Sequence, residues 1–278
     1  MSEQKNQIEK KKKKRKLKWY IKLILYILLL ILYARFIEPN IILTKEYKIT
    51  SKNISIENHG LTIMQISDLH FKSSISENFL ERLIVKVNEN KPDIVIFTGD
   101  LIDENYVINK EDEKLLLKYM SKIKANIDKY YILGEEDSKD TKYILDKSNF
   151  ISIDKEEQLV YINDNIPIAL INKNCHKKYL ENYKDKKLFT LLILHNPNDI
   201  NKIEKYNYDF IIAGHTHNGN INIPYFKKLY INSSYIKDKQ KVNNSYLYIN
   251  SGIGTNKFNM RLFNYPTINL YRIQKASK

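Results

Sequence analysis

Cysteine, proline and glycine are scarce in this chain. It has 278 residues but only one cysteine, Cys175, with six prolines and seven glycines. A single cysteine excludes an internal disulfide and a cysteine-rich zinc site, so we expect Cys175 to be structural. This usage suits a reducing compartment, or a bacterial protein that works outside the cytoplasm without disulfides. No stretch rich in proline, glycine or serine follows residue 45, so residues 45–278 are expected to form one domain.

Acidic residues are too few to balance the basic ones, and the excess is unevenly distributed. The net charge is +14, yet residues 1–38 hold 11 Lys and Arg against 3 Asp and Glu, while the other 240 residues hold 35 against 29. Most of the basicity therefore belongs to an N-terminal tail. Few arginines and aromatic residues stand together as base-stacking platforms, so a nucleic-acid partner is not expected.

One long apolar run stands next to this tail. Residues 23–34 are uninterrupted by any charge, and residues 19–37 carry only Lys22 and Arg35, each near one end. At 1.5 Å per residue, nineteen helical residues span roughly 28 Å, close to the hydrocarbon thickness of a bilayer. The pattern predicts a transmembrane anchor at 19–38.

The lysines before the anchor predict its orientation. Residues 1–18 are expected to form a basic cytoplasmic tail, which would leave the rest of a single-pass protein outside the cytoplasm at the cell membrane. Other interpretations are open. A buried core helix would want a polar face, which residues 23–33 lack, and a cleaved signal peptide would want a small-x-small site, which "LYARFIEP" lacks. The segment would also be able to lie flat on anionic lipids.

From about residue 61, short apolar runs alternate with helical patterns. Apolar residues recur at helical spacing over 79–87 and 116–127, and Ser74 with Glu77 suits a capping box before the first of these helices. The alternation predicts an α/β domain with a layered sheet. Buried strands are predicted at 61–67, 93–99, 129–134, 166–171, 189–194, 209–214, 246–250 and 267–273.

Candidate metal ligands follow five of these strands, in "SDLH", "GDLID", "GEED", "LHNP" and "GHTH". The candidates are Asp68, His70, Asp100, Glu135, Glu136, His195, His215 and His217. Each motif alone is weak, but five in order indicate a site, which we expect at one edge of the sheet. In extended segments, Asp-x-His and His-x-His would direct both side chains to one face. Imidazole mixed with carboxylate suits Mn, Fe or Zn better than Ca.

Other chemically active side chains have plainer interpretations. His59 and His176 lie in polar stretches and are expected at the surface. Asp103 and Asp137 are expected to form turns or to support ligands. Arg261 is expected either to contact a substrate phosphate or to form a salt bridge.

Together, at these spacings, the five motifs resemble the calcineurin-like metallophosphoesterases from about residue 60 onward. The ending "NSGIGTNKFNMRLFNYPTI" and the anchor are similar to a membrane-associated bacterial branch of that family. The resemblance implies a four-layer αββα sandwich and two divalent metal ions. It implies one ion held by Asp68, His70, Asp100 and His217, and another held by Asp100, Glu135, His195 and His215. A water bridging the ions would lose a proton, and the resulting hydroxide would attack phosphorus in line.

The chain departs from the family pattern Gly-Asn-His-Asp/Glu, because residues 134–137 read "GEED". Glu135 replaces an asparagine ligand and can itself bind a dication. Glu136 replaces a histidine that stabilises the transition state or protonates the leaving oxygen. A protonated Glu136 would still act as a catalytic acid, whereas an ionised one would repel phosphate. After "GHTH", residues 218–220 replace Gly-Gly-Gln and alter a loop beside the site.

Two functions follow. The first is a membrane-anchored two-metal phosphoesterase for a phosphomonoester or phosphodiester. A lipid-linked or envelope phosphate is the attractive substrate, since the anchor would hold the domain near the bilayer. The second is a catalytically impaired relative that binds metal and phosphate but has lost turnover through Glu136.

Overall fold

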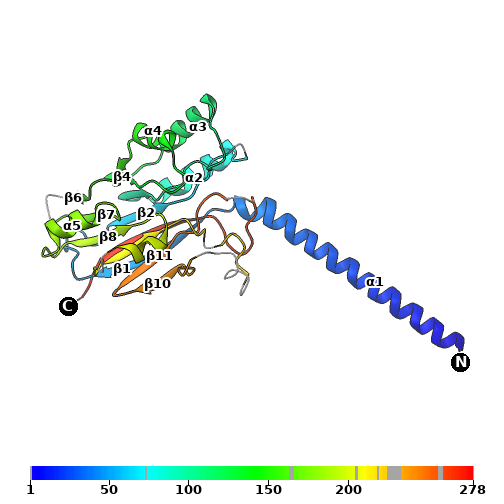
Figure 1. The fold of residues 1–278 in the computed structure, drawn as a ribbon. Coiled ribbons are helices and arrows are strands. Elements are labelled where there is room, and N and C mark those ends of the chain that lie inside the picture. Colours follow the sequence, from blue (N-terminus) through cyan, green and yellow to red (C-terminus); the bar gives the residue numbers. More distant parts are fainter. Residues whose placement is uncertain are drawn as a thin grey trace.

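Two six-stranded sheets form the centre of the molecule (Figure 1). The computed structural model describes residues 2–72, 74–162, 166–203, 206–217, 219–223, 233–255 and 259–277. The strand order of the first sheet is β1 (Leu43–Ser51), β12 (Thr267–Lys275), β2 (Thr62–Ile66), β3 (Ile94–Phe97), β4 (Asp128–Tyr131) and β5 (Ile151–Ser152). The order of the second is β10 (Lys239–Val242), β11 (Ser245–Ile249), β9 (Phe210–Ala213), β8 (Phe189–Ile193), β7 (Ile168–Asn172) and β6 (Gln158–Val160).

The strands that precede the candidate ligands are parallel within each sheet. In the first sheet β2, β3, β4 and β5 are parallel neighbours, while β12 is antiparallel to β2. In the second sheet β11, β9, β8 and β7 are parallel, and β10 and β6 are antiparallel at the two edges. The carboxyl ends of β2, β3 and β4 therefore share one edge of the first sheet, and those of β8 and β9 share one edge of the second.

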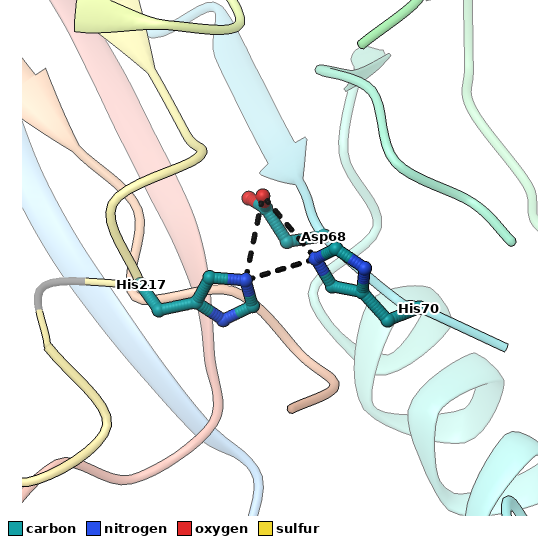
Figure 2. A group of neighbouring side chains, drawn as sticks. All are labelled: Asp68, His70 and His217. Atoms are coloured by element: carbon teal, nitrogen blue, oxygen red, sulfur yellow. Dashed lines mark hydrogen bonds and ion pairs between the residues drawn. The ribbon is translucent and has the colours of Figure 1, made fainter. Parts of the chain in front are cut away.

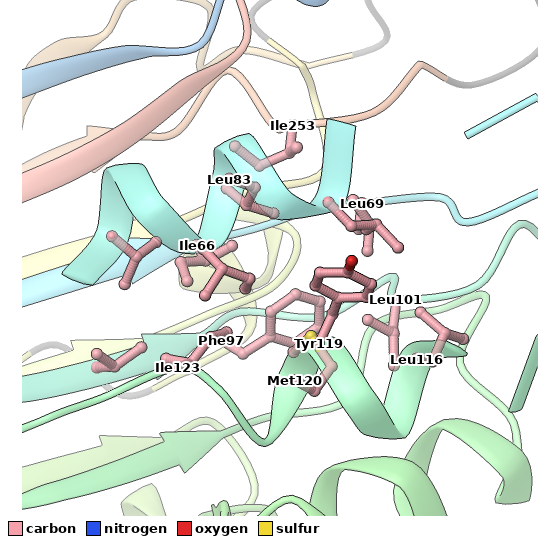
Figure 3. Close-up of a cluster of buried hydrophobic side chains, with 14 of the residues drawn as sticks. Ile66, Leu69, Leu83, Phe97, Leu101, Leu116, Tyr119, Met120, Ile123 and Ile253 are labelled. Atoms are coloured by element: carbon pink, nitrogen blue, oxygen red, sulfur yellow. The ribbon is translucent and has the colours of Figure 1, made fainter. Parts of the chain in front are cut away.

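Three hydrophobic cores separate four layers, which confirms the predicted αββα sandwich. The first core lies between the first sheet and helices α2 (Glu77–Glu89), α3 (Lys110–Met120) and α4 (Lys139–Lys147). Figure 3 shows part of it, where Leu83, Tyr119 and Met120 of the helices lie around Ile66 and Phe97 at the ends of two strands. The second core joins the two sheets. The third joins the second sheet to α5 (His176–Tyr183) and the 3-10 helix η3 (Pro197–Lys202).

Two details of the helices differ from the sequence prediction. Helix α2 is capped by Ser76, whose hydroxyl accepts an N–H of the first turn, and not by Ser74. Helix α3 ends at Met120 instead of continuing toward 127, because the chain must turn there to enter β4. Ile123 is still buried in the first core, and Ile127 packs against the second. Both residues are therefore part of the hydrophobic interior, as their apolar character indicated, but they lie beyond the helix.

The two histidines predicted at the surface have different environments. His59 is exposed, as expected. His176 is 4% exposed at the start of α5 and is hydrogen-bonded to the Tyr208 hydroxyl, so the prediction for it is wrong. Its polar neighbours in the sequence occupy the outer face of a short helix whose inner face packs on the second sheet. Cys175 is buried in the same core.

A long helix, α1 (Ser2–Leu32), projects from the domain (Figure 1). It continues through a π-helical turn, η1 (Tyr33–Ile37), and a 3-10 turn, η2 (Glu38–Asn40). Its large apolar side chains face outward; Ile24 and Tyr26 are each 65% exposed. This excludes the interpretation as a buried core helix. In the part of the chain that the structure describes, it is the one helix long and apolar enough to cross a membrane, by length and composition.

Candidate metal centre

The candidate ligands converge where the carboxyl ends of the two sheets meet. They lie in the loops after β2 (Asp68, His70), β3 (Asp100), β8 (His195) and β9 (His215, His217). The ligand atoms of the first triad, Asp68, His70 and His217, lie within 4.8 Å of one another, and so do those of the second triad, Asp100, His195 and His215. The sequence predicted a site at one edge of a single sheet. The structure instead places it where the edges of two sheets face each other.

The first triad is almost closed to solvent, with each member no more than 5% exposed. His70 Nε2 lies 2.9 Å from His217 Nε2 and 3.9 Å from Asp68 Oδ1. His217 Nε2 lies 3.7 Å from the same Asp68 oxygen. Figure 2 shows the three side chains pointing toward one common space. Two N–H hydrogens do not fit in a 2.9 Å gap, so at least one imidazole directs its lone pair into that space.

The second triad opens toward solvent. His195 is 5% exposed, and its Nε2 lies 3.1 Å from Asp100 Oδ2 and 3.2 Å from His215 Nδ1. The His215 side chain is 35% exposed. Asp100 stands between the triads, because its Oδ2 also lies 3.8 Å from His70 Nε2. This position is compatible with a carboxylate that bridges two ions.

Glu135, the remaining predicted ligand, lies at the open side. Its side chain is 56% exposed, and Oε2 is 4.0 Å from His215 Nε2. Its other oxygen accepts a hydrogen bond from Asn196 Nδ2 at 2.9 Å. Glu135 therefore borders the second triad without belonging to it.

Glu136 lies behind the first triad. Its side chain is 14% exposed, and its Oε2 accepts the Nδ1–H of His70 at 2.9 Å. The same oxygen accepts the Glu104 backbone N–H at 3.2 Å. With His70 and Asp100 it forms a third group of potential ligands. The hydrogen bond to Nδ1 leaves Nε2 of His70 to face the common space.

Five of the seven predicted ligands have a left-handed backbone: Asp68 (φ 53°), His70 (43°), Asp100 (58°), His215 (64°) and His217 (47°). Such values cost a non-glycine residue on the order of 1–3 kcal/mol and persist only where the surroundings impose them. The expected extended conformation is therefore wrong. The Asp-x-His and His-x-His pairs reach a common space from strained loops, not from strands.

Two glycines let the ligand loops approach each other. Gly99 has φ +98°, and a Cβ there would lie 2.7 Å from His195 Nδ1. A Cβ on Gly214 would overlap the Ser67 hydroxyl and the Asp68 carboxylate. Any larger residue at either position would push ligands of the two sheets apart.

Hydrogen bonds behind the ligands set their orientation. His195 Nδ1 donates to the Thr98 carbonyl at 2.8 Å, which leaves Nε2 for a cation. Asp137 accepts three backbone N–H groups, from Asp100, Leu101 and Gly134, at 2.7–2.9 Å. Asp137 thus supports the ligand loops, one of the roles predicted for it.

The buried acids make the centre attractive to cations. Burial by itself lowers the pKa of His195, but the hydrogen bond with Asp100 and the charges of Asp68 and Asp100 outweigh it and raise the pKa to about 10. The pKa of His70 is raised in the same way against the effect of burial, by Glu136 and the two aspartates. In the metal-free chain, protons on these imidazoles stand where metal ions would bind.

His217 behaves differently. Burial, followed by the positive charges of His70 and Arg261, holds its pKa well below the ordinary value. The ring is therefore neutral and able to accept the Nε2–H of a protonated His70. A neutral imidazole is the form that binds a metal ion.

The donor set fits two divalent transition-metal ions. Four imidazoles and two aspartates in two triads provide the mixed nitrogen and oxygen ligands that Mn, Fe and Zn accept and that Ca does not prefer. Ligand atoms spread over 4.8 Å or less can surround an ion at bond lengths of about 2.1 Å. The facing Nε2 atoms of His70 and His217, and the raised pKa of His195, agree with a site built for cations.

A buried scaffold behind His217 was missed by the sequence analysis. Arg261 is fully buried and donates to the carbonyls of Ser251 and Gly252 at 3.0 and 2.9 Å. It therefore contacts no substrate phosphate, and it forms no ion pair within the described residues, so both predicted roles are wrong. Asn264 donates from Nδ2 to the His217 carbonyl at 2.6 Å. Arg261 and Asn264 both lie in the stretch "NSGIGTNKFNMRLFNYPTI", which resembles the family. That resemblance was the one feature of the sequence that pointed to them.

The loop after "GHTH" is described in part. Asn218 lies outside the described residues. Gly219 is buried, and its carbonyl accepts a second hydrogen bond from Asn264 Nδ2, at 2.7 Å. Asn220 is half-buried, and its carbonyl accepts the backbone N–H of Leu262 at 2.9 Å. This loop is thus tied to the C-terminal segment.

Comparison with known proteins gives a family match. A family model described as calcineurin-like phosphoesterase matches residues 61–219. The uncharacterized metallophosphoesterase YkuE of Bacillus subtilis (strain 168) is 25% identical over 260 residues, which cover 88% of this chain and 90% of that protein. The UDP-2,3-diacylglucosamine pyrophosphatase LpxG of Chlamydia trachomatis is 26% identical over 254 residues, which cover 70% of this chain and 75% of that protein. The crystal structure of Pseudomonas putida nuclease MPE aligns with 56% of this chain and 61% of its own, at 12% identity and a TM-score of 0.33.

The matched segment makes up more than half of the chain and contains all seven predicted ligands. It begins at the first buried strand of the sandwich and ends just after the "GHTH" loop. The layers, the converging loops and the match together establish that this chain belongs to the calcineurin-like phosphoesterase family.

Proposed function

We propose that this protein is a membrane-anchored phosphoesterase that uses two divalent metal ions to hydrolyse a phosphomonoester or phosphodiester. The observation that carries the proposal is the pair of triads joined by Asp100, whose Oδ2 lies 3.1 Å from His195 and 3.8 Å from His70. Two ions at such a centre activate water and neutralise the phosphoryl oxygens. Membership of a phosphoesterase family supports this reaction type.

The ligand roles we propose follow the two triads. Asp68, His70 and His217 would hold one ion, His195 and His215 the other, with Asp100 between them. Glu135 would complete the second group from the open side, where it lies 4.0 Å from His215. A phosphate would approach between these two exposed side chains, since the protein closes the first triad. The catalytic role of Glu136 stays a prediction.

We propose a single-pass membrane protein with its N-terminus in the cytoplasm and its domain outside. The exposed apolar length of α1 and the basic residues of the tail support this topology. Protease is added to cells whose envelope layers outside the cell membrane have been removed. It should degrade the domain and leave the tail protected. Protection of the domain would reverse the orientation.

The substrate class we propose is a phosphoester carried by a membrane lipid. A cavity of about 250 Å³ lies between the end of the long helix and the domain, lined by Arg35 and Phe36 on one side and by Phe79 and Ile253 on the other. A guanidinium beside apolar side chains suits the boundary between a phosphate group and an acyl chain. Among the relatives, LpxG is named for action on a diacylated nucleotide sugar, which supports the same class.

Full-length protein in detergent, loaded with Mn²⁺, tests the proposal. Hydrolysis of an aryl phosphodiester should be abolished by a chelator and restored by Mn²⁺. A panel of phospholipids, nucleotide sugars and aryl phosphates should show highest kcat/KM for a lipid-linked phosphate. Bound metal without hydrolysis of any of these compounds would contradict the proposed activity.

A second candidate function is metal and phosphate binding without turnover. The observation that favours it is the Glu136 carboxylate, which is committed to His70 and stands at the position of a family histidine. Glu136→His separates the two functions: a gain of about 10²–10⁴-fold over an inactive wild type would locate the defect there. Glu104→His places a histidine on an exposed neighbour and serves as the control. An active wild-type protein excludes this second function.

A further inference from the structure

The long helix does not end as a free tether, because its last turns are bonded to the C-terminal segment. The Arg261 backbone N–H donates to the Ala34 carbonyl at 2.9 Å. The hydroxyls of Tyr33 and Tyr265 lie 3.0 Å apart. An anchor that only held the domain at a membrane would need neither contact.

Glu38, in the turn after the helix, makes the most unusual of these contacts. It is fully buried, and its Oε1 accepts the Asn264 backbone N–H at 2.5 Å. Its Oε2 has no partner at hydrogen-bond geometry within the described residues, although the Tyr33 side chain lies close enough to interact with the carboxylate. A buried carboxylate is unfavourable unless hydrogen-bonded or near a positive charge, and the buried Arg261 supplies that charge. An apolar side chain would fill this position at lower cost, so the carboxylate indicates a specific task.

Asn264 connects Glu38 to the metal centre. While its backbone is held by Glu38, its side-chain amide donates to the carbonyls of His217 and Gly219 at 2.6 and 2.7 Å. His217 depends on this support, because its φ of 47° is unfavourable and its Nδ1 has no partner among the described residues. The ring is therefore positioned through its backbone. Asn264 thus links Glu38, at the helix end, to His217 of the first triad.

We propose that Glu38 is a positioning residue of the metal centre, acting through Asn264 on His217. This role rests on the proposed two-metal function. It makes the end of the helix part of the catalytic unit. A fragment beginning at residue 45 lacks Glu38 and should bind metal less well than the full chain.

Titration of full-length protein in detergent with Mn²⁺, followed by the electron paramagnetic resonance of the free ion, counts sites and affinities without turnover. Glu38→Ala should weaken one of two sites by about 10-fold, the lower range for residues that support ligands. Glu38→Gln keeps an acceptor for the Asn264 N–H and should retain both sites.

The companion variants separate positioning from general stability. Asn264→Ala should show the same loss as Glu38→Ala, and the double variant should be no weaker than either, because both act on His217 by one route. Arg82→Ala removes the hydrogen bond from Arg82 to the Asn40 side chain, which ties the same helix end to α2 without touching Glu38 or Asn264. It should bind both ions like the wild type.

Each outcome of these titrations supports or overturns the positioning role of Glu38. Wild-type affinity in Glu38→Ala, or additive losses in the double variant, overturns the role of Glu38 and leaves the metal centre intact. An equal loss in Arg82→Ala overturns it too, since general loosening of the helix end would then be the cause. Where thermal denaturation shows Glu38→Ala unfolded, Asn264→Ala decides: one weakened site supports the role, and normal uptake overturns it. A wild type that takes up no Mn²⁺ overturns the proposed function, and this role with it.

Discussion

The two triads of the metal centre use the same residue types but differ in enclosure. His70 and His217 are 1% and 5% exposed, whereas the His215 side chain is 35% exposed and that of its neighbour Glu135 is 56% exposed. In the closed half both histidines are held from behind, by Glu136 on His70 and by Asn264 on His217, while in the open half the Thr98 carbonyl holds His195. The difference suggests a division of labour, in which one ion site is fixed by burial and the other is left open to substrate.

The largest effect is expected where the two halves join. Asp100→Asn removes the negative charge between the triads. It keeps the size of the side chain and one of its two oxygens. Because the ions contribute several kcal/mol to phosphoryl transfer, kcat should fall on the order of 10³-fold. Metal analysis should show fewer than two bound ions. Asp103→Asn, three residues on and paired with Lys72 at 2.9 Å, is the matched control and should keep both ions.

Removing one histidine from each half sharpens the comparison. His217→Ala should weaken metal binding by about 10²-fold, since the closed half gives water little access to replace the ligand. His215→Ala should cost about 10-fold, because water can take an open coordination position. Calorimetric titration of both variants with Mn²⁺ measures the difference. Equal losses, or a greater loss for His215→Ala, would show that enclosure does not distinguish the halves.

A smaller effect concerns protons. The pKa of His195 is raised to about 10 from an ordinary value near 6.5, so its charge stabilises the metal-free fold fully below about pH 6.5. That contribution is lost as the pH rises toward 10. Chelator-treated protein should therefore become less stable to denaturant between these values, with a shallower dependence in His195→Asn. An equally steep dependence in the variant would contradict the assignment.

Metal uptake should release those protons. At pH 6 ions should displace protons from His195 and His70, whose pKa values are both raised above 6.5, whereas His217, whose pKa is held well below that value, releases none. The apparent binding enthalpy should then vary with the ionisation enthalpy of the buffer. No variation would mean that neither imidazole is protonated before metal binds.

Continuous apolar runs were enough to predict the central strands. Every residue of β2, β3 and β8 is buried, so the sequence there has no polar alternation to obscure the signal. Strand β1 was missed because its exposed residues Glu46 and Lys48 break any apolar run. Strands β5 and β6 hold too few residues to form a pattern, and β10, "KQKV", has one apolar residue.

The candidate ligands could be picked out from the sequence because their chemistry is rare in this chain, with six histidines in 278 residues. Their strained loops could not, since a positive φ at Asp68 or His217 is imposed by contacts between the two sheets. Asn264 and Glu38 could not be recognised from any sequence motif. Glu38 binds the backbone N–H of Asn264, and Asn264 binds the carbonyl of His217, both far away in the sequence. Glu38 lay inside the segment assigned to the anchor and was read as part of it.

The central claim is that Asp68, Asp100 and four histidines hold two neighbouring metal ions. Electron paramagnetic resonance of the full-length protein loaded with two equivalents of Mn²⁺ tests it most directly. Ions roughly 3.5–4 Å apart should give a spin-coupled spectrum, which Asp100→Asn should convert to that of an isolated ion. A spectrum of uncoupled Mn²⁺ in the wild type with two equivalents bound would contradict the account.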